Sequence, residues 1–295
     1  MKTKHKVLVL VWAVLWSSAL GGQTSGYSCS RCAEWNALQT PFRIFGNTYY
    51  VGPSGVGSIL ITSTKGHVLL DGALPESAGQ IASNIRKLGF RVEDVKLILN
   101  SHAHFDHAGG IAELQRLSGA HVAASDWSAA VLTDGVLGKD DPQYGTIPAS
   151  ARVSNIERLH DGQTLHVGDI SVTAHLTPGH TPGGTSWTWV SCEQDRCLKM
   201  VYADSLTPVS ADGYQFTNHA ATIAGFHKSY EFLRQVGCDI VLTPHPDVSS
   251  QWRDIKAWRL EGKHQPAIDG SACRQLADQA SEQLRQRLAS EKSAK

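Results

Sequence analysis

The sequence has no surplus of either charge. Its 295 residues carry 27 Lys and Arg against 27 Asp and Glu, so the formal net charge is zero. Proteins that hold nucleic acid or an anionic membrane by electrostatics carry a basic excess, and we expect neither partner here. The chain also has no short-period repeat and no low-complexity linker, which argues against a repeat array. Its length and its 41% hydrophobic residues are enough for one large domain or two small ones.

Long apolar runs are scarce as well. The strongest, residues 7–16, follows Lys2, Lys4 and Lys6 and precedes the small residues of Ala19-Leu20-Gly21. About ten apolar residues are too few to span a bilayer, and this order of segments is typical of a secretory signal peptide. We therefore expect residues 1–21 to be cleaved and residues 22–295 to be exported to the periplasm as one domain, free of the membrane.

Six cysteines form an even set, which favours disulfides in an oxidising compartment. Short separations favour a bond between Cys192 and Cys197, which leaves Cys238 to pair with Cys273. Cys29 and Cys32 could bond to each other, and their pairing stays open. Four cysteines around a structural zinc ion are the alternative.

Three histidines and an aspartate crowd into six consecutive positions, within residues 101–110. They are His102, His104, Asp106 and His107. An apolar segment of strand length, residues 95–100, comes before them, and a segment with helical spacing, residues 111–117, comes after. The pattern predicts a tight loop at the carboxyl end of a strand. Neutral imidazole and carboxylate groups are the ligands that suit zinc.

Two further histidines follow predicted strands in the same way. His180 lies in the glycine- and proline-rich turn 177–184, and His245 lies in the turn 243–246. Three histidine-bearing loops that follow three strands can converge on one edge of the sheets. This arrangement favours a metal site formed where the three loops meet, rather than a histidine-rich loop on the surface.

The six side chains divide into two predicted zinc sites. His102, His104 and His180 would give three nitrogen ligands and leave a fourth position open, as catalytic zinc sites do. Asp106, His107 and His245 would hold a second zinc ion. Two ions about 3.5–4 Å apart can share a hydroxide that is nucleophilic at neutral pH. Asp106 could also hold or accept a proton, which makes it a candidate catalytic residue.

Hairpins alternate with strand–loop–helix units along the chain. We expect hairpins over residues 42–51, 58–72 and 184–202, a helix from Pro75 to Gly89, and an irregular stretch over residues 133–154. Further helices are expected over residues 220–235 and at the end of the chain. Two mixed sheets packed on each other with helices outside would accommodate this order, giving an α/β domain of four layers, αββα.

Four segments together resemble the metallo-β-lactamase superfamily, and more narrowly the class B β-lactamases of the third subclass. They are residues 101–110, 177–184, 203–207 and 243–246. His107 stands where other class B enzymes have an arginine or a similar residue, and Ser205 stands where the first two subclasses have a cysteine ligand. The Cys238–Cys273 pair also matches the third subclass.

The resemblance implies an exported enzyme with two Zn2+ ions per chain that hydrolyses the amide bond of small-molecule β-lactams. The substrates would be penicillins, cephalosporins and carbapenems, and the result would be antibiotic resistance. In that family a zinc-bridging hydroxide attacks the lactam carbonyl, and the second zinc ion stabilises the departing nitrogen. Ser205 and Thr207 would hydrogen-bond the substrate carboxylate, and Gln143 would face the substrate. No protein partner is implied.

Two other functions stay open. A lactonase or thioesterase of the same fold would use an aspartate that bridges both metal ions, and Asp204 lies at or next to that place. A non-catalytic zinc-binding protein would take up metal without hydrolysing any ester or amide.

Overall fold

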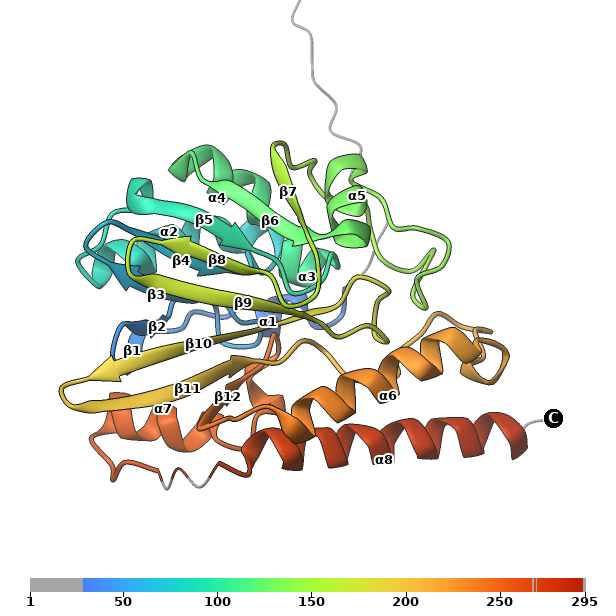
Figure 1. The fold of residues 1–295 in the computed structure, drawn as a ribbon. Coiled ribbons are helices and arrows are strands. Elements are labelled where there is room, and N and C mark those ends of the chain that lie inside the picture. Colours follow the sequence, from blue (N-terminus) through green and yellow to red (C-terminus); the bar gives the residue numbers. More distant parts are fainter. Residues whose placement is uncertain (1–28, 267, 269, 294–295) are drawn as a thin grey trace, which may run out of the picture.

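Two β-sheets lie face to face in the computed structural model, and helices cover the outer face of each (Figure 1). The structure describes residues 29–266, 268 and 270–293, so the predicted signal peptide, residues 1–21, lies outside the described residues. The arrangement confirms the four-layer αββα sandwich predicted from the order of hairpins and helices.

The first sheet is mixed, with seven strands in the order of the sequence. Its first four strands pair antiparallel, and the remaining pairs are parallel. The strands are β1 (Phe42–Phe45), β2 (Thr48–Tyr50), β3 (Ile59–Ser63), β4 (Gly66–Leu70), β5 (Val95–Leu99), β6 (His121–Ser125) and β7 (Ile156–Leu159).

The second sheet has five strands in the order β12-β11-β10-β9-β8. The β11–β12 pair is parallel and the other pairs are antiparallel. The strands are β8 (Thr164–Val167), β9 (Ile170–Leu176), β10 (Thr185–Glu193), β11 (Arg196–Tyr202) and β12 (Ile240–Leu242).

Helices form the outer layers. The α-helices are α1 (Cys32–Trp35), α2 (Ala78–Lys87), α3 (Phe105–Ala108), α4 (Ile111–Ser118), α5 (Asp126–Asp134), α6 (Ala220–Gln235), α7 (Trp252–Glu261) and α8 (Ala272–Ser293). Short 3-10 turns are η1 (Pro75–Ser77), η2 (Val92–Asp94), η3 (Phe216–Asn218) and η4 (Pro246–Val248). Helices α2, α4 and α5 pack on the first sheet, and α6 and α8 pack on the second.

Strand β3 shows why its sheet needs cover on both faces. Ile59 and Ile61 point into the apolar layer between the sheets, whereas Leu60 points toward the helices, and all three are buried. Because side chains alternate along a strand, an unbroken apolar run places apolar side chains on both faces of the sheet. Other elements must therefore pack on both faces. Trp187 and Trp189, two positions apart on β10, both occupy the central layer.

Three helices differ from the sequence-based expectation. The loop that begins at Ser101 becomes helical after His104, so Asp106 and His107 lie on the single turn α3 rather than on a loop. Helix α5 covers the start of the stretch expected to be irregular; the Ser125 side chain caps it by accepting from the Ser128 N–H. Helix α7 had no predicted counterpart, because charged residues interrupt its apolar ones and only Trp252 and Ile255 are buried.

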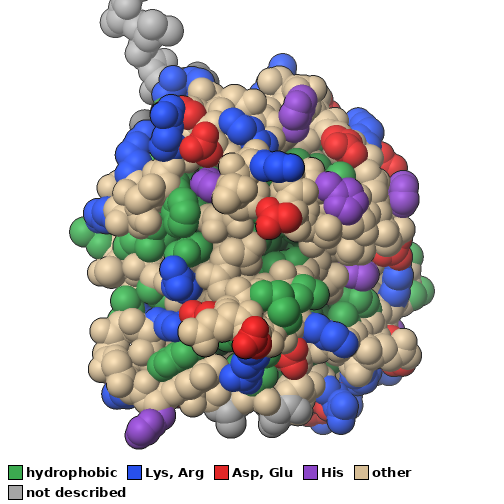
Figure 2. Space-filling model, turned by 60° about the vertical axis from the view of Figure 1, so that its left-hand side comes forward, with side chains coloured by type: hydrophobic (Ala, Val, Ile, Leu, Met, Phe, Trp, Pro, Cys, Tyr) green, Lys and Arg blue, Asp and Glu red, His purple; other side chains and the backbone are tan. Residues whose placement is uncertain are grey.

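Three disulfides join the cysteines in sequence order: Cys29–Cys32, Cys192–Cys197 and Cys238–Cys273. The second closes the β10–β11 hairpin, and the third ties the loop before β12 to the start of α8. None of the helices in the described part of the chain has the length and apolar character to cross a membrane. Basic and acidic side chains are interspersed on the face shown in Figure 2, in keeping with the balanced composition.

Candidate metal centre and active site

Most candidate site residues follow strands that end at the same edge of the sandwich; Gln143 instead lies in the irregular stretch after α5. His102 follows β5, His180 follows β9, and His245 follows β12, while Asp204 and Ser205 follow β11. Because the carboxyl ends of these strands meet at one edge, loops that are distant in sequence come together there. The convergence inferred from the three histidine-bearing turns is therefore present in the fold.

The first group consists of His102, His104 and His180, whose nearest ring nitrogens all lie within 4.8 Å of one another. The three rings are buried. The ring centroid of His102 is 4.8 Å from that of His104 and 4.9 Å from that of His180. Three imidazoles thus face a common point.

The second group consists of Asp106, His107 and His245, again with ligand atoms within 4.8 Å. Asp106 Oδ2 lies 3.2 Å from His107 Nε2 and 3.4 Å from His245 Nε2. The two groups adjoin, because the rings of His102 and His107 are only 4.4 Å apart.

Burial and repulsion from neighbouring imidazoles favour the neutral forms of His102 and His180. Burial lowers the pKa of His102 well below its usual value, and the neighbouring imidazoles of His107 and His104 lower it further. Burial, followed by the charge of His104, lowers the pKa of His180 from 6.5 to about 3. Burial would raise the pKa of Asp106, but His107 and His245 hold it well below its usual value. Neutral imidazoles beside an ionised carboxylate are the protonation states that a divalent cation requires.

A second set of contacts fixes the outer nitrogen of four of the five imidazoles; His107 Nδ1 is buried with no hydrogen-bond partner among the described residues. Asp204 Oδ1 lies 2.7 Å from His102 Nδ1, and Asp141 Oδ2 lies 3.2 Å from His104 Nε2. The Thr207 carbonyl accepts from His180 Nδ1 at 2.9 Å, and the Gly55 carbonyl accepts from His245 Nδ1 at 3.0 Å. Partners of this kind select the tautomer and the orientation of a ligating ring.

The Asp204 carboxylate occupies the space beside Gly184 that any other side chain at position 184 would fill. A Cβ atom at Gly184 would collide with Asp204 Oδ2 and with the Thr177 carbonyl. Burial, and then the charge of Asp71, raises the pKa of Asp204 well above its usual value. A cation on the opposite nitrogen of His102 would favour the ionised carboxylate and offset that cost.

The loop before His102 is itself held by a buried carboxylate. Asp71, at the end of β4, accepts from the Ser101 N–H at 2.7 Å and the Ser101 hydroxyl at 2.6 Å. It also accepts from the Tyr202 hydroxyl at 2.9 Å. These bonds join the two sheets at the point where the histidine-bearing loop begins.

The residues present fit zinc. The donor set is five imidazoles and one carboxylate, which zinc prefers. His102 Nε2 is fully buried and has no hydrogen-bond partner among the described residues, although its other ring nitrogen is fixed by Asp204. A buried imidazole nitrogen without a partner is costly, and a cation at the centre of the group would satisfy it.

A cleft opens over both groups. The three predicted substrate-binding residues, Gln143, Ser205 and Thr207, line it together with Asp106. The Gln143 amide nitrogen lies 3.5 Å from His104 Nδ1 and 3.4 Å from His180 Nε2. The three predicted substrate-binding residues and four of the six predicted metal ligands therefore line one cleft; the other two, His102 and His107, are fully buried beside them.

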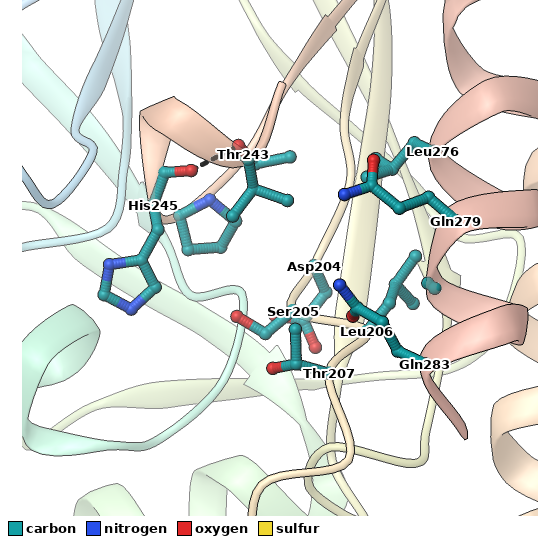
Figure 3. Close-up of a pocket in the computed structure, with 12 residues that line it drawn as sticks. Asp204, Ser205, Leu206, Thr207, Thr243, His245, Leu276, Gln279 and Gln283 are labelled. Carbon is teal, nitrogen blue, oxygen red and sulfur yellow. Dashed lines mark hydrogen bonds between the residues drawn. The ribbon is translucent and has the colours of Figure 1, made fainter. Parts of the chain in front are cut away.

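The cleft has two walls that sequence patterns did not indicate. Arg31 and Trp35, from the segment closed by the Cys29–Cys32 bond, lie along its rim, and the Trp35 ring packs 5.0 Å from the His245 ring. On the other side of Ser205 and Thr207, a pocket reaches to Gln279 and Gln283 of α8 (Figure 3).

The carboxylates of Asp141 and Asp204 are the functional contacts that sequence reasoning missed. Asp141 lies in the irregular stretch after α5, where no spacing connects it to His104. Asp204 was considered only as a possible bridging ligand, whereas the structure places it on His102 Nδ1. Neither residue carries a local sequence signal for its role.

The fold and the paired donor groups define the class of protein. The chain belongs to the metallo-β-lactamase superfamily, whose family model matches residues 51–193. Its structure is similar to that of the Rm3 metallo-β-lactamase, with a TM-score of 0.86 and 50% identity over 90% of this chain and 99% of that chain.

A second solved structure is similar over nearly the same span. MEM-A1, a subclass B3 metallo-β-lactamase isolated from a soil metagenome library, has a TM-score of 0.84 and 48% identity, covering 88% of this chain and all of the other. These neighbours confirm the resemblance to the third subclass. A curated relative, the hydroxyacylglutathione hydrolase of Rhodopseudomonas palustris strain BisB5, is 30% identical over 125 residues. That match covers 42% of this chain and 38% of the relative's length.

Proposed function

We propose that this chain is an exported β-lactamase that binds two zinc ions and hydrolyses the amide bond of penicillins, cephalosporins and carbapenems. One observation carries the proposal: two adjoining donor groups line the cleft, and the single carboxylate among them is Asp106. Asp204, which a lactonase or thioesterase would use to bridge the metal ions, is instead hydrogen-bonded to the outer nitrogen of His102. The similarity to subclass B3 enzymes over most of the chain supports the same conclusion.

His102, His104 and His180 would hold one zinc ion, and Asp106, His107 and His245 would hold the other. Bound there, the ions would polarise a carbonyl group and lower the pKa of water to about 7. The protein's own share is to keep His102 and His180 neutral by burial. It also orients four of the five rings through hydrogen bonds to their outer nitrogens.

Three side chains are placed to orient the substrate. The hydroxyls of Ser205 and Thr207 lie on one wall of the cleft and can donate to a carboxylate. Gln143, which also lines the cleft, can hydrogen-bond a carbonyl group of the substrate. Asp106 lies between His107 and His245 with a depressed pKa, so it stays ionised. A proton that it accepts at an Oδ atom during turnover would be released readily, because the low pKa makes it a weak base.

The proposed periplasmic location is supported by the predicted signal peptide and by three disulfides, which persist in oxidising compartments. Export also places the enzyme where β-lactam antibiotics act, so resistance would follow from its activity.

A substrate panel tests the proposal. Zinc-loaded protein should hydrolyse a carbapenem, followed by the loss of its ultraviolet absorbance, much faster than an N-acyl homoserine lactone or a glutathione thioester. A preference for the lactone or the thioester would point instead to another hydrolase of the same fold. Zinc uptake without hydrolysis of any of the three would indicate a non-catalytic zinc-binding protein.

A further inference from the structure

The last turns of α8 reach back to a loop of the active site. Glu291, only 7% exposed, accepts hydrogen bonds from the backbone N–H groups of Phe216 at 3.0 Å and Thr217 at 2.9 Å. Burial raises its pKa, but these two N–H groups and Arg287 together bring the pKa below its usual value. A buried, ionised carboxylate therefore fixes the end of the loop formed by residues 205–218.

Arg287 holds the middle of the same loop. Its guanidinium donates to Glu291 Oε1 at 2.7 Å, to the Ser210 hydroxyl at 2.8 Å and to the Tyr214 carbonyl at 2.9 Å. A longer bond of 3.4 Å reaches the Pro208 carbonyl. The planar fork of an arginine can hold several acceptors in one geometry, which a lysine cannot.

The 205–218 loop touches the active site on two sides. Its Thr207 carbonyl fixes the His180 ring, and the Thr207 side chain lines the cleft. Further along, the Ala211 N–H donates to the Pro142 carbonyl at 2.9 Å. Pro142 lies between Asp141, which contacts His104, and Gln143, which faces the cleft. The positions of Thr207 and of the segment that carries Asp141 and Gln143 thus depend on this one loop.

We propose that Arg287, held by Glu291, is a positioning residue for substrate recognition: it fixes the 205–218 loop and, through Ala211, the segment that carries Asp141 and Gln143. Arg287 lies on α8, outside the set of residues that line the cleft, so it acts through the loop and not on the substrate. The kinetic part of this inference rests on the proposed β-lactamase function.

Arg287→Ala should raise the KM for a carbapenem about tenfold while kcat changes less than about threefold, because a loosened loop weakens binding more than it alters the metal ligands. Zinc content should stay at the wild-type value. Arg287→Lys should recover part of the KM, since a lysine can reach one acceptor. Arg285→Ala is the matched control: Arg285 lies on the same helix and pairs with Glu282 on the exposed side.

A second readout does not need turnover. In metal-free protein, hydrogen exchange at the amides of residues 209–217 should be faster in Arg287→Ala and in Glu291→Gln than in Arg285→Ala, with α2 and α6 unchanged. Equal KM values and equal loop exchange in Arg287→Ala and Arg285→Ala would overturn the inference. If no variant hydrolyses β-lactams and yet the loop exchange changes as stated, the proposed function fails while the positioning role stands.

Discussion

The contact between Asp204 and His102 offers the sharpest test of how the first metal group is built. The two atoms are 2.7 Å apart, and both side chains are fully buried, at 0% exposure. Asp204→Ala removes the short contact of His102 Nδ1 and leaves that buried nitrogen with only the Ser101 hydroxyl, 3.4 Å away. Loss of an outer partner of this kind lowers metal affinity about 10- to 100-fold, which corresponds to about 1.4–2.8 kcal/mol.

Asp204→Asn separates orientation from ligation. The asparagine carbonyl oxygen can still accept from His102 Nδ1, so the variant should bind two zinc ions with affinity close to that of the wild type. If Asp204 bridged both metal ions, as in an aspartate-bridged hydrolase, the amide would be a poor ligand and zinc would be lost.

Competition with a chromophoric chelator measures these affinities directly. The control is Asp169→Ala, since Asp169 is an exposed carboxylate on the β8–β9 turn. Zinc affinity in Asp204→Ala equal to that of the control would refute the orienting role. Loss of a zinc ion from Asp204→Asn would refute the assignment of Asp204 as an outer contact and favour the bridged alternative.

Three further predictions follow from the same geometry. His180→Ala should abolish carbapenem hydrolysis and reduce bound zinc by at least one ion per chain, measured by atomic absorption; full activity with unchanged zinc would contradict its assignment as a ligand. Replacing Cys238 and Cys273 together by alanine should lower the free energy of unfolding by about 4 kcal/mol, because the bond closes a loop of 35 residues; an unchanged urea midpoint would contradict this. Metal-free protein should lose stability as the pH falls below about 6.5, since the unfolded state then protonates His102 and His180 while the folded state, with depressed pKa values, does not. The slope should be up to about 1.4 kcal/mol per pH unit for each group, and urea unfolding at pH 7.5, 6.5 and 5.5 that gives equal free energies would contradict it.

The fold was largely predictable because its strands carry a strong local signal. Segments such as Ile170–Leu176 alternate apolar and polar residues, and helix α6 was predicted with the bounds Ala220–Gln235 that the structure has. The single turn α3 was missed since four residues are too short for a helical period. Helix α7 was missed because Trp252 and Ile255 are its only buried residues, too few to form an apolar stripe.

The donor groups were predictable for a different reason. His102, His180 and His245 each come shortly after a strand, and the carboxyl ends of these strands, from both sheets, meet at one edge of the sandwich. The outer contacts had no such signal: Asp141 and Asp204 meet their histidines across sequence separations of 37 and 102 residues. Arg287 is still harder to foresee, because nothing in an amphipathic helix shows which loop its far end will hold.

Titration of metal-free protein with zinc, with a carbapenem present, tests the central claim most directly. The account predicts no loss of ultraviolet absorbance without metal, turnover that rises to a plateau at about two zinc ions per chain, and full inhibition by excess chelator. Turnover that persists in chelator, or its absence at saturating zinc, would contradict it.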